Sequence, residues 1–298
     1  MMKRISLTVV LFILVLIFPF QTAHSQIRYY KGNTHAHTTN SDGVLSLNDL
    51  IKKYKDLQYD FLVVTDHNIL ADAELLSTPD FLIINGEEVT GSTHITAIGL
   101  KEQIPWTSSQ NVIDSINAQG ALPVINHPRR TNTLWTASQL LNTSGVSLIE
   151  IFNASNERRG YHDDHSLWDE VLTSGKMLYG VASDDTHLAR EIGQAWIMVL
   201  SPSLDKDHII DAIRKGNFYA STGILIDDMH YSNGSVYVKS RNGSAVKFIG
   251  KNGLLLTSFT GCEGRYAFKG DEKYIRVEAE GASGKKAWTQ PFFIHPGP

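Results

Sequence analysis

The hydrophobic and polar positions divide the chain into two parts with different periodicity. From about residue 27 to residue 226, short apolar runs rich in β-branched residues alternate with amphipathic helical segments. Strands are expected at 29–32, 61–65, 81–85, 94–99, 122–126, 148–152, 178–182 and 195–200. Helices are expected at 46–57, 109–119, 136–142, 164–174 and 205–215. Strands that alternate with helices indicate βα units around a parallel sheet, and this number of them predicts a barrel.

After residue 226 the pattern changes to short alternating strands with no helical stretch between them. These are expected at 231–240, 245–249, 253–259, 266–269, 274–279 and 287–294, separated by Asn-Gly, Gly-Lys and Gly-Asp turns. The sequence therefore predicts an α/β barrel domain over 26–226 and a small C-terminal antiparallel β-sandwich domain over 227–298. A packing role is favoured for the second domain, with binding to a polymer or a protein as the alternative.

The first residues have the order of a secretory signal peptide. Lys3 and Arg4 precede an apolar run over 5–18, and Ala23-His24-Ser25 forms a small-x-small cleavage site. The alternative is a membrane anchor, but the run is shorter than the roughly 18 residues that span a bilayer. We expect cleavage after residue 25, giving a secreted or periplasmic protein without stable membrane insertion. The sole cysteine, Cys262, is far from this site, so neither a lipoprotein anchor nor an intramolecular disulfide is expected.

The charge of the mature chain argues against a nucleic-acid partner. Removing residues 1–25 takes away Lys3 and Arg4 and no acid, so the formal net charge falls from −4 to −6. No extensive nucleic-acid surface is expected from this balance. Twelve histidines and one cysteine mean that imidazole and carboxylate, not thiolate, must supply any metal ligands.

Potential metal ligands stand at the ends of the apolar runs. His35 and His37 have i, i+2 spacing, which places both side chains on one face of an extended segment. The residues of this kind at strand ends are His35, His37, Asp42, His67, Glu88, His94, His127, Asp185 and His187. Nine exceed the needs of one ion, so we expect two or three divalent cations. Zinc, manganese and iron are all compatible with such ligands.

These residues occur in an order that resembles the PHP (polymerase and histidinol phosphatase) superfamily. The matching elements, spread over residues 29–200, are His35-Ala36-His37, Ser41-Asp42-Gly43, Thr65-Asp66-His67, Gly86-Glu87-Glu88, His94, His127-Pro128 and Asp185-Thr186-His187. A narrower resemblance, to the CehA/McbA branch of metallohydrolases, rests on Asp184-Asp185-Thr186-His187, Gly193, Trp196 and the segment 216–223.

The PHP resemblance implies a distorted (β/α)7 barrel that holds a trinuclear centre. The first ion would be held by His35, His37, Glu88 and Asp185, the second by Glu88, His94 and His127, and the third by Asp42, His67 and His187. Glu88 is then the bridging carboxylate, chosen by the Gly-x-Glu spacing, with Glu87 as the alternative. The Asp-x-His spacing selects Asp185 over its neighbour Asp184.

The predicted function is a metal-dependent phosphoesterase in which a metal-bridged hydroxide attacks a small, phosphorylated substrate. Glu88 and Asp185 are predicted to be catalytic through the metals, and Arg129 and Arg190, with Arg130, to clamp phosphate oxygens. Asp66 is a candidate for orienting an imidazole. Glu150 is expected either to support the site at the barrel mouth or to cap a loop at its strand end. The alternatives are an amide, ester or carbamate hydrolase, as in the CehA/McbA branch, and a non-catalytic binding protein. The sequence does not give the oligomeric state.

Overall fold

The strands of the first two-thirds of the chain form the frame of the molecule. The computed structural model describes residues 27–161 and 165–293, so the predicted signal peptide lies outside the described residues. The strands of this frame are β1 (Arg28–Asn33), β2 (Phe61–Val64), β3 (Leu82–Thr90), β4 (His94–Ile98), β5 (Leu122–Ile125), β6 (Leu148–Asn153), β7 (Tyr179–Ser183), β8 (Trp196–Ser201) and β9 (Phe218–Ser221).

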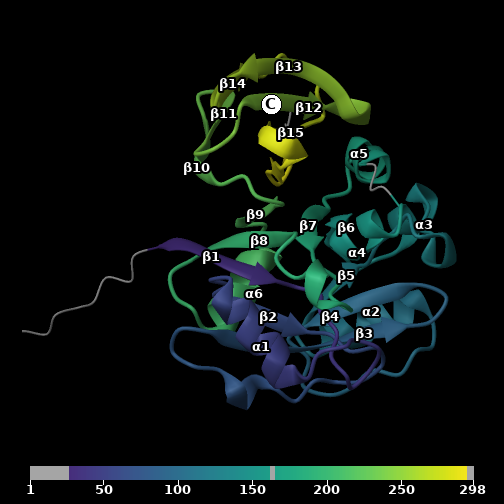
Figure 1. Ribbon diagram of the computed structural model, residues 1–298. Helices are drawn as coiled ribbons and strands as arrows, with labels where there is room; N and C mark the ends of the chain where they lie inside the picture. The colour runs from purple at the N-terminus through teal and green to yellow at the C-terminus, as the bar shows by residue number, and fades with distance from the viewer. Residues whose placement is uncertain (1–26, 162–164, 294–298) are drawn as a thin grey trace, which may run out of the picture.

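Helices follow these strands and cover the frame (Figure 1). They are α1 (Leu47–Asp56), α2 (Ser109–Ala118), α3 (Ala137–Asn142), α4 (Ala154–Arg158), α5 (Ser166–Thr173) and α6 (Lys206–Arg214). Side chains bond the free N–H groups at their first turns: the Ser46 hydroxyl accepts from the Asp49 N–H at α1, and Thr136 with Gln139 forms a capping box at α3. Among the described residues, no helix is long and apolar enough to span a membrane.

The strand order brings several carboxyl ends to one rim. β1, β2 and β3 are parallel neighbours, β4 runs antiparallel between β3 and β5, and β5, β6 and β7 are parallel again. β8 pairs antiparallel with β1, and β9 antiparallel with β8. The carboxyl ends of β1, β2, β5, β6 and β7 therefore share one rim, which we call the mouth, and the end of β9 lies there too.

The frame has apolar side chains on both of its faces. In β2, Phe61 and Val63 pack in one cluster with Ile209 and Ile213 of α6, while Leu62 packs in another with residues of α1. Alternate residues of a strand point to opposite faces, so a continuous apolar run is needed where both faces are covered. This is the pattern from which β2 was predicted.

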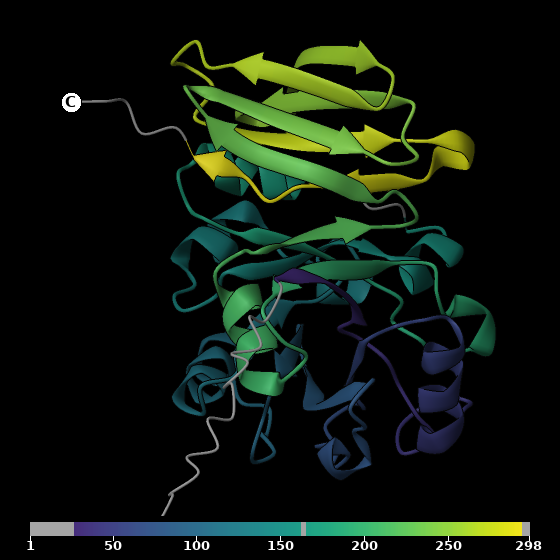
Figure 2. The same ribbon diagram turned by 90° about the vertical axis from the view of Figure 1, so that its left-hand side faces the viewer.

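The C-terminal strands form a sandwich at one end of the molecule (Figures 1 and 2). They are β10 (Ile226–Ser232), β11 (Ser235–Ser240), β12 (Ala245–Gly250), β13 (Leu254–Thr260), β14 (Glu263–Ala267), β15 (Tyr274–Glu280), β16 (Lys286–Trp288) and β17 (Phe292–Phe293). β10, β11 and β14 make one sheet, and β12, β13, β15 and β16 belong to the other. Val236, Val238, Phe248 and Val277 pack in the core between them.

The second sheet of the sandwich is continuous with the barrel sheet. β16 pairs with β9, through Ala287 with Ser221 and Trp288 with Ala220. Beyond β7, the barrel ladder is capped by a side chain: the Gln290 amide accepts from the Gly180 N–H at 2.8 Å and donates to its C=O at 2.9 Å. The C-terminal part thus forms hydrogen bonds with main-chain groups of the barrel both at β9 and at β7.

The structure confirms the predicted fold class, a mixed α/β sheet frame followed by an antiparallel C-terminal β region. The barrel strands begin and end within a few residues of their predicted limits, except that β3 continues to Thr90. The segment 231–240, predicted as one strand, is instead part of a hairpin, because Asn233 and Gly234 have positive φ values of 49° and 69°. β9 and α4 were not predicted. The division at residue 226 stays a prediction.

Candidate metal centre

All nine side chains predicted as metal ligands converge at the mouth. They come from segments far apart in the sequence: the loop after β1 (His35, His37, Asp42), the residue group after β2 (His67), the β3–β4 hairpin (Glu88, His94), the end of β5 (His127) and the loop after β7 (Asp185, His187). Three groups among them offer ligand atoms that lie within 4.8 Å of one another. The strand ends therefore position the donors, as the barrel prediction requires.

Glu88 lies at the centre of this arrangement. Its Oε1 is 3.1 Å from both His94 Nδ1 and His127 Nε2, and its Oε2 is 2.8 Å from His67 Nδ1 and 3.4 Å from His35 Nε2. Burial alone would raise the pKa of Glu88, but the imidazoles around it, His35 foremost, hold the pKa well below its ordinary value. Glu88 is therefore a carboxylate whose two oxygens face different histidines, as a bridging ligand requires.

Asp185 completes a second group with the histidines of the first motif. Its Oδ1 lies 3.2 Å from His35 Nε2 and 3.1 Å from His37 Nε2, and the three side chains are buried. Asp185 has φ of 49°, and His127 has φ of 26°. Non-glycine residues rarely adopt such values, and strained backbone is typical of sites where side-chain placement matters more than local stability.

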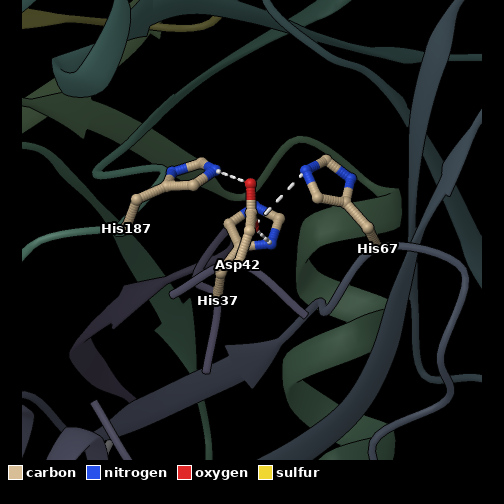
Figure 3. Close-up of side chains that lie close together, drawn as sticks. All are labelled: His37, Asp42, His67 and His187. Atoms are coloured by element: carbon tan, nitrogen blue, oxygen red, sulfur yellow. Dashed lines mark ion pairs between the residues drawn. The ribbon is translucent and has the colours of Figure 1, made fainter. Parts of the chain in front are cut away.

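A third group surrounds Asp42 on the open side of the cluster (Figure 3). The Asp42 carboxylate lies 3.3 Å from His187 Nε2, 3.7 Å from His67 Nε2 and 3.7 Å from His37 Nδ1. The hydrogen bond with His187 is the main reason that the pKa of Asp42 falls to about 2. The Asp42 side chain is 55% exposed, whereas Glu88 and Asp185 are 1% exposed, so this group faces the solvent.

The grouping differs in detail from the predicted one. His37, predicted for the first ion only, belongs both to the group with His35 and Asp185 and to the group with Asp42. His67, predicted for the third ion only, also groups with Glu88 and His94. Which histidine binds which ion stays a prediction, because two of them lie between neighbouring groups.

Glu150 fixes two of these ligands from behind. Its Oε1 lies 2.8 Å from His35 Nδ1 and accepts a hydrogen bond from Ser183, while its Oε2 accepts from the His127 N–H at 2.6 Å and from Asn153 at 3.0 Å. With Nδ1 of His35 engaged in this way, its Nε2 faces the cluster. Such an outer carboxylate sets the orientation of a metal-binding imidazole and strengthens it as a ligand.

Asp66 organises the first-motif loop through hydroxyl and main-chain groups. Its carboxylate accepts from the N–H and the hydroxyl of Thr38 and from the hydroxyl of Ser41, each at 2.7 Å. The sequence favoured a bond from Asp66 to an imidazole, but its observed partners lie between His37 and Asp42. Asp66 therefore holds the turn that carries these two residues into one group.

The acids beside the two central carboxylates point elsewhere. Glu87 accepts from the Ile104 N–H, and burial raises its pKa to about 7. Asp184 accepts from the N–H groups of Gly193, Gln194 and Ala195, each at 2.8 Å, and burial raises its pKa to about 6. Both acids hold loops, so Glu88 and Asp185 are the members of each pair that reach the cluster.

Sequence reasoning missed several residues that support the ligands. Asn126 donates to Glu88 Oε1 at 2.8 Å, Asn153 donates to Asp185 Oδ2 at 3.2 Å, and Glu191 Oε2 accepts from the His187 N–H at 2.7 Å. Asn126 directly follows β5, and Asn153 is the last residue of β6, both at the mouth. That position is the signal that could have identified them.

The predicted phosphate clamps lie outside the nine-residue cluster. Arg129 is exposed and Arg130 is half-buried, both just after His127. Arg190 is exposed in the 3-10 turn η3 (Ala189–Glu191) and lines a cavity of about 310 Å³ beside the centre. Their assignment as phosphate ligands stays a prediction.

Comparisons with known proteins agree with this architecture. Residues 176–218 match a family model described as PHP-associated. The chain is similar to a two-domain protein from Bacteroides vulgatus ATCC 8482 containing a predicted PHP-like metal-dependent phosphoesterase, with a TM-score of 0.52 and 15% identity over 90% of this chain and 95% of that one. The chain has a PHP-type fold. The PHP resemblance drawn from the motifs is confirmed, whereas the CehA/McbA branch stays a prediction.

A second solved structure with some likeness is PsfC from Pseudomonas syringae PB-5123. It is 14% identical over 62% of this chain and 88% of its own, with a TM-score of 0.47. No match to this chain was found among curated proteins. The assignment of the PHP-type fold therefore depends on the Bacteroides structure and the family model.

The residues present at the mouth of this PHP-type fold fit divalent cations. His37 Nδ1 is buried and has no hydrogen-bond partner among the described residues. Leaving buried polar atoms unpaired is costly unless a ligand satisfies them. The donors are imidazole nitrogens and carboxylate oxygens, which suit zinc, manganese or iron.

Proposed function

We propose that this chain is a metal-dependent phosphoesterase that hydrolyses a small phosphorylated substrate. The observation that carries the proposal is the position of Glu88, whose Oε1 faces His94 and His127 while its Oε2 faces His67 and His35. The PHP-type fold supports it, because the similar Bacteroides protein is described as containing a predicted PHP-like metal-dependent phosphoesterase. Cations held there would act as Lewis acids toward phosphoryl oxygens and lower the pKa of water.

Other residues of the chain fix the donors in place or face the incoming substrate. Glu150 holds His35, and Asp66 holds the loop between His37 and Asp42, so the donors are fixed before substrate arrives. Asp42 is the most exposed of the carboxylates in the three groups, so substrate approaches from its side. Arg129 would bring positive charge to the scissile phosphate from the loop after β5.

Hydrolysis assays with metal-loaded mature protein test the proposal. A panel of phosphomonoesters, phosphodiesters and nucleotides is offered with zinc, manganese or iron(II), alongside aryl esters and carbamates. We expect turnover of at least one phosphoester class. Turnover of esters or carbamates alone would favour the carbonyl hydrolase instead, and absence of any turnover would favour a binding protein.

Glu88→Gln tests whether Glu88 is a bridging carboxylate. The substitution keeps the shape of the side chain but removes the charge that faces the histidines. We expect at least a 100-fold loss of kcat and less bound metal per chain, with an unchanged circular dichroism spectrum. Glu170→Gln, an exposed change on α5, is the matched control and should keep full activity. Equal activities of the two variants would falsify the bridging role.

We also propose that the enzyme acts outside the cytoplasm. The support is the order of charged, apolar and small residues over 1–25. Expression of the full chain in a bacterium, followed by fractionation and N-terminal sequencing, should find a periplasmic or secreted protein beginning at Gln26. A cytoplasmic product that starts at Met1 would contradict the proposal.

A further inference from the structure

A cavity of about 310 Å³ lies where the mouth meets the C-terminal part of the chain. We call it the junction cavity. Three of its walls lie at strand ends of the mouth: Phe152 of β6 with α4 directly after that strand, η3 after β7, and Thr222 after β9. The fourth wall is the turn η5 (Ala282–Gly284) with Lys285, which belongs to the C-terminal part.

One wall of the junction cavity is bonded directly to the candidate metal centre. Glu191, which lines the cavity, accepts from the N–H groups of His187 and Leu188 at 2.7 and 2.8 Å. Its other oxygen lies 2.6 Å from Arg158 Nε, so the Glu191 charge is already paired. A group bound in the cavity is therefore next to the loop that carries Asp185 and His187.

Two cations in the walls have no such pairing. Among the described residues, the side chains of Arg190 and Lys285 form no hydrogen bond or ion pair, although both line the cavity. The stem of Lys285 rests on Gly223, where a Cβ would lie 3.2 Å from Lys285 Cγ and 3.3 Å from its Cδ. Lys285 is thus packed against the mouth along its stem.

We propose that the junction cavity binds a second anionic group of the substrate, a phosphate or a carboxylate remote from the scissile ester. Arg190 offers a planar guanidinium and Lys285 an ammonium, the two side chains that most favour such anions. Ser283 and Thr222 also line the cavity, and the Thr222 hydroxyl bonds to the main chain of Lys286. The inference rests on the proposed phosphoesterase function and gives the C-terminal part a role in substrate selection.

Matched substrate pairs test the inference. Fructose 1,6-bisphosphate against fructose 6-phosphate measures the effect of a second phosphate, and 3-phosphoglycerate against glycerol 3-phosphate measures that of a carboxylate. Each pair gives a ratio of kcat/KM for the metal-loaded protein. In Lys285→Gln, we expect the ratio of the preferred pair to fall by about tenfold or more, the loss of one charge-assisted hydrogen bond. The loss should appear mainly in KM.

A control variant and a binding measurement distinguish failure of this inference from failure of the proposed function. Lys239→Gln, an exposed change on β11 outside the cavity, should leave both ratios unchanged. The inference is overturned if the kcat/KM ratios of the wild type are near one, or if the ratio of the preferred pair is unchanged in Lys285→Gln. Either result leaves the proposed phosphoesterase function standing. If the wild type hydrolyses no phosphoester, the proposed function fails, and calorimetry with the same compounds decides the inference. Weaker binding of the two-anion compound to Lys285→Gln supports it, and equal binding overturns it.

Discussion

At the scale of single residues, Glu150 has the largest predicted effect outside the ligands. It holds His35 through Nδ1 and the His127 main chain through its N–H. We expect Glu150→Gln to reduce metal affinity by about 10- to 100-fold, because the amide cannot accept from all of these donors. Competition with a chromogenic chelator measures the affinity. Glu170→Gln is the control, and equal affinities of the two variants would contradict this role.

The convergence of the nine candidate ligands could be predicted from sequence, but most of the hydrogen bonds that hold them could not. His-x-His spacing and the acid or histidine after each apolar run are local features, and a parallel sheet brings strand ends together wherever its strands lie along the chain. The bonds from Asp66 to Thr38 and from Glu191 to His187 depend on how two loops meet. No local pattern carries that information, so Asp66 was assigned the wrong kind of partner.

At the scale of elements, a buried ion bridge joins α5 to β15. The Arg276 guanidinium donates to both oxygens of Asp169, at 2.7 and 2.8 Å, and to Glu278 at 2.6 Å. Burial alone would raise the pKa of Glu278, but the hydrogen bond with His165 and the charge of Arg276 hold the pKa well below its ordinary value. The bridge thus keeps the buried Glu278 carboxylate charged between the barrel and the C-terminal part.

Arg276→Met should therefore lower the free energy of unfolding at pH 7 by about 3–5 kcal/mol, because it leaves uncompensated charges buried. A carboxyl with a depressed folded-state pKa contributes stability above its unfolded pKa of about 4.3 and loses it as the pH falls toward the folded value. The difference between wild type and variant should narrow below pH 4.3. Urea denaturation at pH 7 and pH 4 measures it.

The control for this bridge is Arg241→Met. Arg241 pairs with Asp227 on the surface at 2.7 Å, where water already solvates both charges. We expect Arg241→Met to change the free energy of unfolding little at either pH. Equal losses for Arg241→Met and Arg276→Met at pH 7 would show that the buried bridge contributes no more than a surface pair.

Element limits were predictable to different degrees for a physical reason. β2 and α1 have strong local signals, an apolar run and an N-cap serine, and both appear close to their predicted limits. β9 is a short strand paired on one side with β8 and on the other with β16. Its strand conformation depends on partners distant in sequence, and the flanking Gly216 and Gly223 weaken the local pattern.

At the scale of the whole molecule, the C-terminal part completes the barrel sheet as well as adding a sandwich. The β9–β16 ladder crosses the division predicted at residue 226, and Trp288 of β16 packs in the same core cluster as Trp168 and Leu172 of α5. The antiparallel character of the chain after residue 226 was predictable from its period and turns, although the turn at Asn233 and Gly234 was missed. The pairing of β16 with β9 was not predictable, because neither strand's own sequence specifies its register with a distant partner.

Gln290 offers the sharpest test of this attachment. Its amide pairs both the N–H and the C=O of Gly180 on the edge of β7, and Gln290 is 7% exposed. Gln290→Leu keeps the volume but leaves two buried main-chain groups unpaired, which should cost about 1–3 kcal/mol for each. Denaturation measures the loss, and amide hydrogen exchange should speed up at Gly180. Gln103→Ala, which removes an exposed hydrogen bond to the Asn68 carbonyl, is the control. It should change neither the free energy of unfolding nor the exchange at Gly180 by much. Unchanged exchange at Gly180 would show that the barrel edge is closed without the C-terminal part, whereas faster exchange with a retained fold would show that the two parts share one hydrogen-bonded frame.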